Sequence, residues 1–283
     1  MKYLCANMAA RRAILILILT LLVKSYYCQT FLDTLIYSRD TTLLDLKVDK
    51  LNNKWLFFEN RIIRVSPEKS YNDTLDNLNL RQLSLDLNTP LKNLFYFRHK
   101  NTIEIKNSRW GVISNIKLDP LHIFEPAFVK FTVDKMIWVL DVSENILYKL
   151  NENGVKISQK RNPFKVNGQF YFPTEVVQIK NYTLAIDTSY GIFILDDYGN
   201  LVQSKKMGSC QGIFEYKGNA YLNKQNYLFQ FQTKHTGEID MTNPKRIEFS
   251  SPVISLQVFN ENALILFRNK RIYELKNFEN LFE

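Results

Sequence analysis

Acidic side chains at the ends of short apolar runs are the first residues of this chain that could do chemistry. Asp141 and Asp187 each end such a run, and Asp196 and Asp197 end the run that follows Asp187. Clustered carboxylates are ligands for Ca²⁺ and other hard cations. The sequence lacks the Asp-x-Asp-x-Asp-Gly spacing of a calcium loop, and an Asp before a turn can bind the turn amides itself. We therefore expect a structural role for these four carboxylates.

Histidine and cysteine give no stronger indication of catalysis or metal binding. His99, His122 and His235 lie far apart in the sequence and no cysteine pair accompanies them, so the ligand spacing of a zinc site is missing. Cys210 stands in GSCQG (208–212), which is not the Gly-x-Ser-x-Gly of a nucleophile elbow, and no base can be assigned to its thiol. Glycine-rich phosphate-binding motifs are also missing from the sequence. The sequence therefore predicts no catalytic residue and no cofactor, and it leaves a metal site open.

The elements that would position these residues are short strands separated by turns. Residues 136–159 divide into MIWVLD, VSEN, ILYKLN, ENG and VKISQ, in which apolar runs alternate with turn residues. Together with the preceding run AFVKFTVD (127–134), they make one unit of four strands. The same order returns in residues 174–205, where Asp187 stands at the position of Asp141. The unit is therefore repeated.

Weaker copies of this unit extend over the rest of the chain. Their middle turns have a mean spacing of about 42 residues and fall near Asn60, Lys100, Ser143, Ser189, Gln225 and Asn269. Four strands per unit at this period predict an all-β fold, a β-propeller with four-stranded antiparallel blades. A β-sandwich or barrel is the alternative, which the common period disfavours. Six units fill residues 29–283. Because some copies are weak, the sequence does not decide whether the propeller has six or seven blades.

The N-terminal segment FLDTLIYS (31–38) reads as a strand without a unit of its own. The sixth unit, in contrast, has only three strands. A propeller has to close its ring so that no long strand edge stays open. We therefore expect residues 31–38 to provide the fourth, outer strand of the last blade.

The third and fourth units resemble NHL-type blades. Pro126 precedes AFVKFTVDKMIWVLDVSENILYKLNENG, and Pro173 precedes TEVVQIKNYTLAIDTSYGIFILDDYGN. Both follow that family's order of proline, strand, strand ending in Asp, turn, strand and glycine-containing turn. The second unit, TPLKNLFYFRHKNTIEIKNSRW, is similar to a degenerate blade of uncharacterised exported propellers of Bacteroidetes. The resemblance implies a propeller fold and export, and it implies no particular activity.

A propeller would bring residues from different blades to its central channel. Lactonase-type propellers hold a divalent metal there with Glu, Asn and Asp side chains, and the residues near blade starts that could do so are Asp119, Glu125 and Glu175. Aromatic residues could instead form a platform for a carbohydrate or peptide. We expect Trp138, inside the clearest strand, to pack in the core. Trp110, in the polar stretch NSRWG, is the better surface candidate.

The first 28 residues have the layout of a secretory signal peptide. Arg11 and Arg12 precede the apolar run AILILILTLLV (13–23), and a polar segment ends at Cys28. As a helix this run would span about 16 Å, short of a hydrocarbon core of about 30 Å, so retention as a membrane tether is the weaker alternative. Lipidation of Cys28 is disfavoured because Tyr27 before it is bulky. We expect a signal peptide of residues 1–28 and a propeller domain of residues 29–283.

Removing residues 1–28 changes the charge of the chain. The whole sequence carries 37 basic and 28 acidic residues, and the four basic residues of the leader leave a net charge of +5 in the remainder. These charges are scattered, which disfavours nucleic-acid binding. After cleavage Cys210 is expected to be the one remaining thiol, which excludes an intramolecular disulfide.

The sequence thus favours an exported, non-catalytic binding or scaffold module in the periplasm or on the cell surface. Its expected partner is a protein or another component of the cell envelope. We expect a monomer that has no transmembrane domain once the leader is removed. The alternative is a propeller-type hydrolase or lactonase with a divalent metal in its channel. Neither the partner nor the binding face follows from the sequence.

Overall fold

The computed structural model describes residues 32–37, 43–49, 51–67, 72–75, 80–87, 89, 91–132, 134–208, 210–234, 238–259, 261–267 and 272–282. The predicted signal peptide and its cleavage site lie outside these residues. Within them, β-strands make up nearly all regular structure, and the helices are four short 3₁₀ segments. None of the described helices has the length and apolar character needed to cross a membrane.

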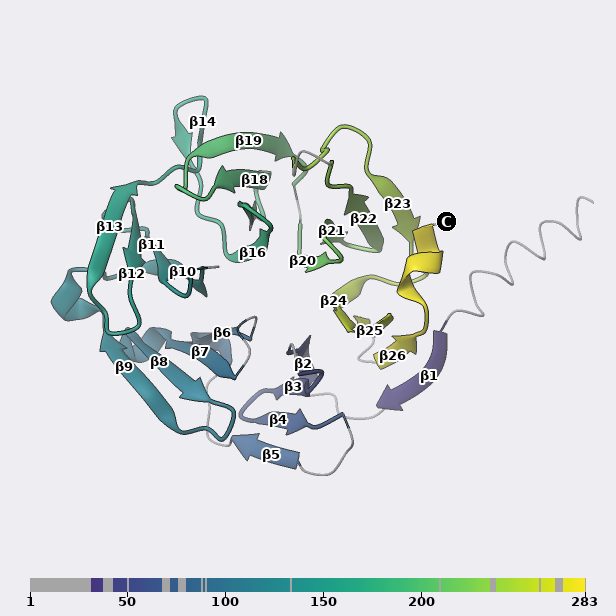
Figure 1. Cartoon of the computed structure of the whole chain (residues 1–283). Helices are drawn as coiled ribbons and strands as arrows, with labels where there is room; N and C mark the ends of the chain where they lie inside the picture. The colour runs from purple at the N-terminus through teal and green to yellow at the C-terminus, as the bar shows by residue number, and fades with distance from the viewer. Residues whose placement is uncertain are drawn as a thin grey trace, which may run out of the picture.

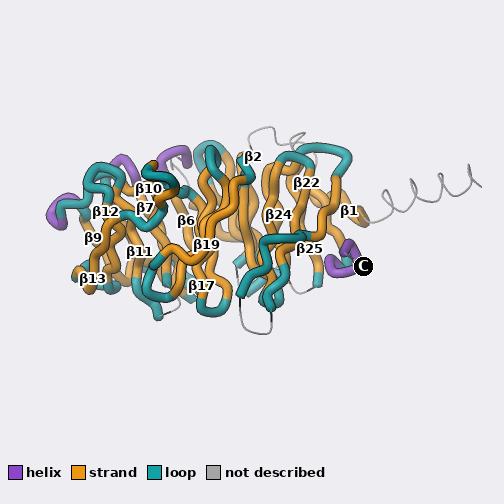
Figure 2. Tube along the Cα trace, turned by 90° about the horizontal axis from the view of Figure 1, so that it is seen from above, coloured by secondary structure: helices purple, strands orange, loops and turns teal. Residues whose placement is uncertain are grey.

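The strands form six four-stranded antiparallel sheets around a central axis, which is a six-bladed β-propeller (Figure 1). Seen after a 90° turn, the ring is a flat disc (Figure 2). The fold predicted from the period of about 42 residues is confirmed, and the sandwich and barrel alternatives are excluded.

Each blade is a meander whose first strand lies at the channel and whose fourth strand lies at the perimeter (Figure 1). Blade 1 consists of β2 (Leu43–Val48), β3 (Lys54–Phe58), β4 (Ile62–Val65) and β5 (Asn72–Leu75). Blade 2 consists of β6 (Leu83–Asp86), β7 (Lys92–Phe97), β8 (Thr102–Asn107) and β9 (Val112–Lys117). Blade 3 consists of β10 (Pro126–Phe131), β11 (Ile137–Asp141), β12 (Ile146–Leu150) and β13 (Lys156–Arg161).

The second half of the chain continues in the same way. Blade 4 consists of β16 (Glu175–Ile179), β17 (Tyr182–Asp187), β18 (Gly191–Asp196) and β19 (Leu201–Lys206). Blade 5 consists of β20 (Gly212–Tyr216), β21 (Asn219–Lys224), β22 (Tyr227–Phe231) and β23 (Lys245–Glu248). Blade 6 consists of β24 (Val253–Phe259), β25 (Asn262–Phe267), β26 (Ile272–Leu275) and β1 (Leu32–Tyr37). Between blades 3 and 4 stands a separate hairpin, β14 (Lys165–Val166) and β15 (Gln169–Phe170), which the sequence did not predict.

The N-terminal strand closes the ring as expected. β1 pairs antiparallel with β26, with Leu32 opposite Leu275 and Tyr37 opposite Ile272. In Figure 1 the purple β1 lies directly beside the yellow C-terminal part of the chain. The prediction that residues 31–38 complete the last blade is confirmed for the described strand.

The core lies between neighbouring blades, because each sheet packs both faces against other sheets. All five residues of β11 are buried, and so are five of the six residues of β17. The outer strands are different, since β13 has no buried residue. A representative core cluster joins Leu94 and Ile103 of blade 2 to Val139 of blade 3. Apolar second and third strands are therefore what hold the ring together.

The turns of a four-strand meander alternate between the two faces of the ring. Turns after the first and third strands lie on one face, which we term the first-turn face. Turns after the second strands and the connections between blades lie on the other, the link face. The middle turns predicted from the sequence all fall between second and third strands, for example at 142–145 and 225–226.

Candidate functional site

Charged residues from three blades gather at the channel. Asp45 and Lys47 lie on β2, Asp86 lies on β6 and Glu175 begins β16, so they belong to blades 1, 2 and 4. Blade 4 stands across the ring from blade 1 (Figure 1). The charges of Glu175, Asp45 and Asp86 all act on the ammonium group of Lys47. We term these four residues the channel cluster.

In the channel cluster Asp86 is buried and the other three residues are half-buried, so their charges act on one another with reduced screening by water. Burial alone would lower the pKa of Lys47, but the carboxylates of Glu175, Asp45 and Asp86 outweigh it and raise the pKa above the ordinary value. Burial also raises the pKa of Asp45, although Lys47, the amide of Leu46 and the Ser255 side chain oppose this effect. Lys47 therefore stays protonated at neutral pH, and its charge is attracted to carboxylates of blades 1, 2 and 4.

The three carboxylates proposed for a channel metal are not brought together. Glu175 joins the channel cluster, whereas Asp119 is exposed and accepts a hydrogen bond from the Asn101 side-chain amide at 2.5 Å. The Glu125 side chain is exposed as well. In the part of the chain that the structure describes, no group of three or more His, Cys, Asp and Glu residues could hold a metal ion.

The sequence missed Asp45, Lys47 and Asp86. The available signal was the alternation of acidic and basic residues in DLKVDK (45–50). The first strand of each blade lies at the channel (Figure 1). Charges at alternate positions of such a strand therefore indicate an axial charge cluster.

Asp141 and Asp187 have the structural role expected from their position before a turn. The Asp141 carboxylate accepts hydrogen bonds from the amide of Glu125 at 2.8 Å and from the Ser143 hydroxyl at 3.0 Å. Asp187 accepts equivalent bonds from the amides of Phe172 at 3.1 Å and Ser189 at 2.8 Å. Each carboxylate thus joins the connection that precedes its blade to the blade's middle turn.

Asp196 and Asp197 also lie at a turn. The Asp196 carboxylate accepts hydrogen bonds from the amides of Tyr198 at 2.9 Å and Asn200 at 2.7 Å. The Asp197 side chain is exposed to solvent. The structural interpretation of Asp196 is supported by these bonds, which close the turn between β18 and β19.

Cys210 lies in the connection between blades 4 and 5, where it packs in the core with 1% of its surface exposed. Burial raises the pKa of its thiol to about 11. A buried, protonated thiol is a poor nucleophile. His99 and His122 are exposed at turns, and His235 lies outside the described residues.

Trp110 is not the surface residue that its polar surroundings indicated. It adopts a left-handed backbone conformation, with φ of 66°, and its half-buried ring packs edge-on against Trp55 at 5.2 Å and Phe95 at 6.0 Å. The guanidinium group of Arg64 lies 4.8 Å from the ring. Trp110 therefore belongs to the contact between blades 1 and 2. Trp138 is buried as expected.

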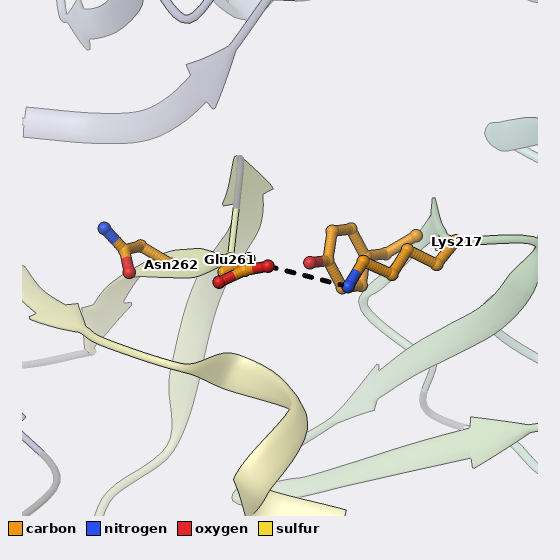
Figure 3. A pocket seen from close by; sticks show the side chains of 4 residues that line it. Lys217, Glu261 and Asn262 are labelled. Carbon is orange, nitrogen blue, oxygen red and sulfur yellow. Dashed lines mark ion pairs between the residues drawn. The ribbon is translucent and has the colours of Figure 1, made fainter.

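An open groove lies on the first-turn face between blades 5 and 6. It has a volume of about 530 Å³ and is lined by Tyr216, Lys217, Glu261 and Asn262. Lys217 and Glu261 point toward one another across it, with 4.0 Å between nitrogen and oxygen (Figure 3). The ammonium group also lies 5.4 Å from the Tyr216 ring. An aromatic ring, an ammonium group, a carboxylate and an amide suit reversible binding of a polar group.

The first-turn face also carries exposed apolar side chains. A much smaller cavity of about 10 Å³ lies there between the first turns of blades 1 and 2, beside Leu51 and Leu91. Ten large apolar side chains are exposed in the described residues, and eight of them belong to first or third turns or to the outer-strand residues next to them. These eight are Leu51, Leu91, Val112, Ile113, Val155, Ile157, Tyr198 and Val202.

The fold is shared with many solved structures. The WD40 β-propeller domain of Doa1 is similar with a TM-score of 0.58 and 9% identity, covering 89% of this chain and 98% of that one. A streptogramin B lyase is similar with a TM-score of 0.57 and 10% identity, covering 86% and 95%. BBS1N, solved in complex with ARL6DN, has a TM-score of 0.55 and 13% identity, covering 86% and 80%. Such low identities show the propeller fold alone. No protein-family model and no curated protein matches the sequence.

Proposed function

We propose that the protein is an exported, non-catalytic binding module of the cell envelope that engages a protein partner through its first-turn face. The observation that carries this proposal is that the open groove and five of the ten exposed large apolar side chains lie at the turns of that face, namely Leu51, Leu91, Val112, Val155 and Tyr198. Turns held by a rigid ring are well suited to binding. Exposed apolar surface that gathers on one face is typical of interaction sites.

Further support comes from the sequence and from similar folds. A signal-like leader of residues 1–28 supports export to the periplasm or cell surface. Units three and four resemble NHL-type blades, and BBS1N is a propeller solved in a protein complex. The propeller acts as a monomer in this proposal, because its ring is closed by its own first strand.

A metal-dependent hydrolase is supported less well than a binding module. The charges of the channel carboxylates Glu175, Asp45 and Asp86 all act on the ammonium group of Lys47. This residue already supplies the positive charge that a metal would otherwise provide. The channel cluster therefore suits a structural role.

The proposal is tested by fractionating cells that produce the full chain and by affinity capture from the envelope fraction. We expect the protein in that fraction, with a partner that Leu51→Ser/Leu91→Ser releases. Phe124→Ser is the matched control, because Phe124 is 49% exposed on the link face. Retention in the cytoplasm, or a partner that both variants hold equally well, would overturn the proposal. A stoichiometric divalent metal in the purified protein would overturn its non-catalytic part.

A further inference from the structure

Three neighbouring outer strands, β9, β13 and β19, carry the same surface pattern. Each has an exposed aliphatic side chain near its start and an exposed basic side chain four positions later. The aliphatic residues Ile113, Ile157 and Val202 are 48%, 53% and 56% exposed. The corresponding basic residues are Lys117, Arg161 and Lys206. We term these six residues the outer track.

The register of the three sheets shows that the aliphatic positions are equivalent. In blade 2, Ser114 pairs with Ile105 while Val112 pairs with Lys106, so that Ile113 is the extra residue of a β-bulge. The same irregularity in blade 3 leaves Ile157 between its paired neighbours Lys156 and Ser158.

Blade 4 repeats this arrangement with Val202 as the extra residue. A β-bulge breaks the regular ladder and re-aims the side chain at that position.

The basic positions are equivalent too. Lys117 pairs with Thr102, Arg161 with Ile146, and Lys206 with Gly191. In each case the partner is the first residue of the blade's third strand. The outer track therefore consists of the same pair of positions, one aliphatic and one basic, in each of the three blades.

Protection of the strand edges against pairing with other molecules explains the bulges and basic residues of the outer track, but not its exposed aliphatic residues. Bulges and lysines on outer strands prevent edge-to-edge pairing between molecules. An exposed aliphatic side chain at the bulge works against that purpose, because it offers apolar surface to a neighbour. One such residue would need no explanation. Three at equivalent positions indicate a surface that makes contact through side chains.

The charge of these strands is strongly one-sided. Their sequences VISNIK, KISQKR and LVQSKK hold six basic residues and no acidic one. Three of the six are engaged within the ring: Lys156 lies 4.2 Å from the Tyr148 ring, Lys160 donates to the Asn200 side chain at 2.9 Å, and Lys205 donates to the Met241 carbonyl. The other three, Lys117, Arg161 and Lys206, are exposed, and the Arg161 guanidinium also lies 5.1 Å from the Phe170 ring.

The three strands follow one another along the perimeter and run in the same direction (Figure 1). Aliphatic and basic positions therefore alternate around blades 2 to 4, with about 13 Å between them within a strand. This arc is convex, so a flat lipid surface would meet one blade at a time. A flexible chain can follow the whole arc.

We propose that the outer track binds an extended acidic polypeptide segment that carries apolar side chains and runs along blades 2 to 4. Its carboxylates face Lys117, Arg161 and Lys206, and its apolar side chains cover Ile113, Ile157 and Val202. The bulges keep the strand edges from pairing, so contact is made by side chains. The inference rests on the proposed function, because it names the chemistry of a partner for the binding module.

The probe is a labelled 20-residue peptide of five Glu-Glu-Val-Val repeats, titrated against the full-length protein at low salt. We expect binding that falls with added salt, because the charges are exposed. The variants K117S/R161S/K206S and I113S/I157S/V202S should each weaken it about tenfold. The control K100S/K245S/R246S removes the same charge from exposed sites on other elements and should leave binding unchanged.

Three results would overturn the inference: no binding of the peptide, equal binding of a Glu-Glu-Ser-Ser repeat peptide, or equal losses in the control variant. Binding of phosphatidylglycerol vesicles that depends on the outer track, without binding of the peptide, would assign the surface to a membrane and also overturn it. An envelope partner that is held by the first-turn face and unaffected by both triple variants would leave the proposed function standing alone.

Discussion

Ser255 of β24 donates a hydrogen bond to the carbonyl oxygen of Leu46 in β2, with 2.8 Å between the two oxygens and 209 positions between the residues. This bond joins the inner strands of the last and first blades. The pairing of β1 with β26 places the N-terminal strand, which precedes blade 1 in the chain, at the outer edge of blade 6. The ring is therefore closed at the channel as well as at the perimeter.

Removal of the inner closing bond should weaken the whole ring. We expect Ser255→Ala to lower the free energy of unfolding by about 1–2 kcal/mol, because the buried Leu46 carbonyl loses its donor. Urea denaturation monitored by tryptophan fluorescence measures the change. Ser158→Ala on exposed β13 is the control and should change stability by less than about 0.5 kcal/mol. Equal effects of the two substitutions would contradict a closing role for Ser255.

Substitution of a carboxylate in the channel cluster should change both the stability of the fold and the pKa of Lys47. Glu175→Gln leaves the half-buried Lys47 with less opposing charge, so we expect stability at pH 7 to fall by about 1 kcal/mol. The raised pKa of Lys47 should fall at the same time, and NMR of ¹³C-methylated lysines measures this shift.

The pH dependence of this effect has a definite sign. A lysine whose folded pKa lies above the ordinary value of 10.5 stabilises the fold below that pH, and the contribution disappears as pH rises through the folded pKa. The stability difference between wild type and Glu175→Gln should therefore be constant at neutral pH and shrink above 10.5. Glu144→Gln, on an exposed turn, is the control.

The contribution of Asp187 to stability should depend on pH in the opposite direction to that of Lys47. Burial alone would raise the pKa of Asp187, but hydrogen bonds from the Ser189 hydroxyl and nearby amides lower the pKa below 3.8. The carboxylate therefore stabilises the fold above pH 3.8 and loses this effect as pH falls through its folded pKa. Asp187→Asn should cost about 2 kcal/mol at pH 7 and clearly less near pH 3. A cost independent of pH, or an equal cost for exposed Asp197→Asn, would contradict the assignment.

Gly191 is needed at the start of β18. It has φ of 138°, and a Cβ atom there would lie 2.5 Å from the Met207 nitrogen and closer still to the Lys205 carbonyl. We expect Gly191→Ala to lower the melting temperature markedly, with a cost of about 2–4 kcal/mol. Gly212→Ala is the matched control, because no atom lies within 4 Å of its Cβ position and its φ is not positive. Calorimetry should separate the two variants.

The repeat in the sequence was sufficient to predict the blades, their middle turns and the closing strand. These features depend on local alternation of apolar runs and turns, which the chain carries in every unit. The role of Asp141 was predictable for the same reason, because its partners lie near it in the sequence or at the start of its own blade.

Side chains that meet across the ring were not predictable in this way. Lys47 and Glu175 are 128 positions apart, and no local pattern joins them. Trp110 was placed wrongly because its ring packs against Trp55 and Phe95 of blades 1 and 2, which lie far from it or outside its polar stretch in the sequence. The equivalence of Ile113, Ile157 and Val202 depends on strand register, which becomes visible only when the pairing is known.

The pairing of β1 with β26 has a consequence for the order in which the protein can form. The first described strand of the chain has its partner at residues 272–275, so it waits for nearly the entire polypeptide to be synthesised. Blades 1 to 5 use only neighbouring strands and can form in the order in which they emerge. Loop closure over such a distance is slow compared with local hairpin formation. Closure of the last blade is therefore a long-range event, unlike the local pairing of strands within blades 1 to 5.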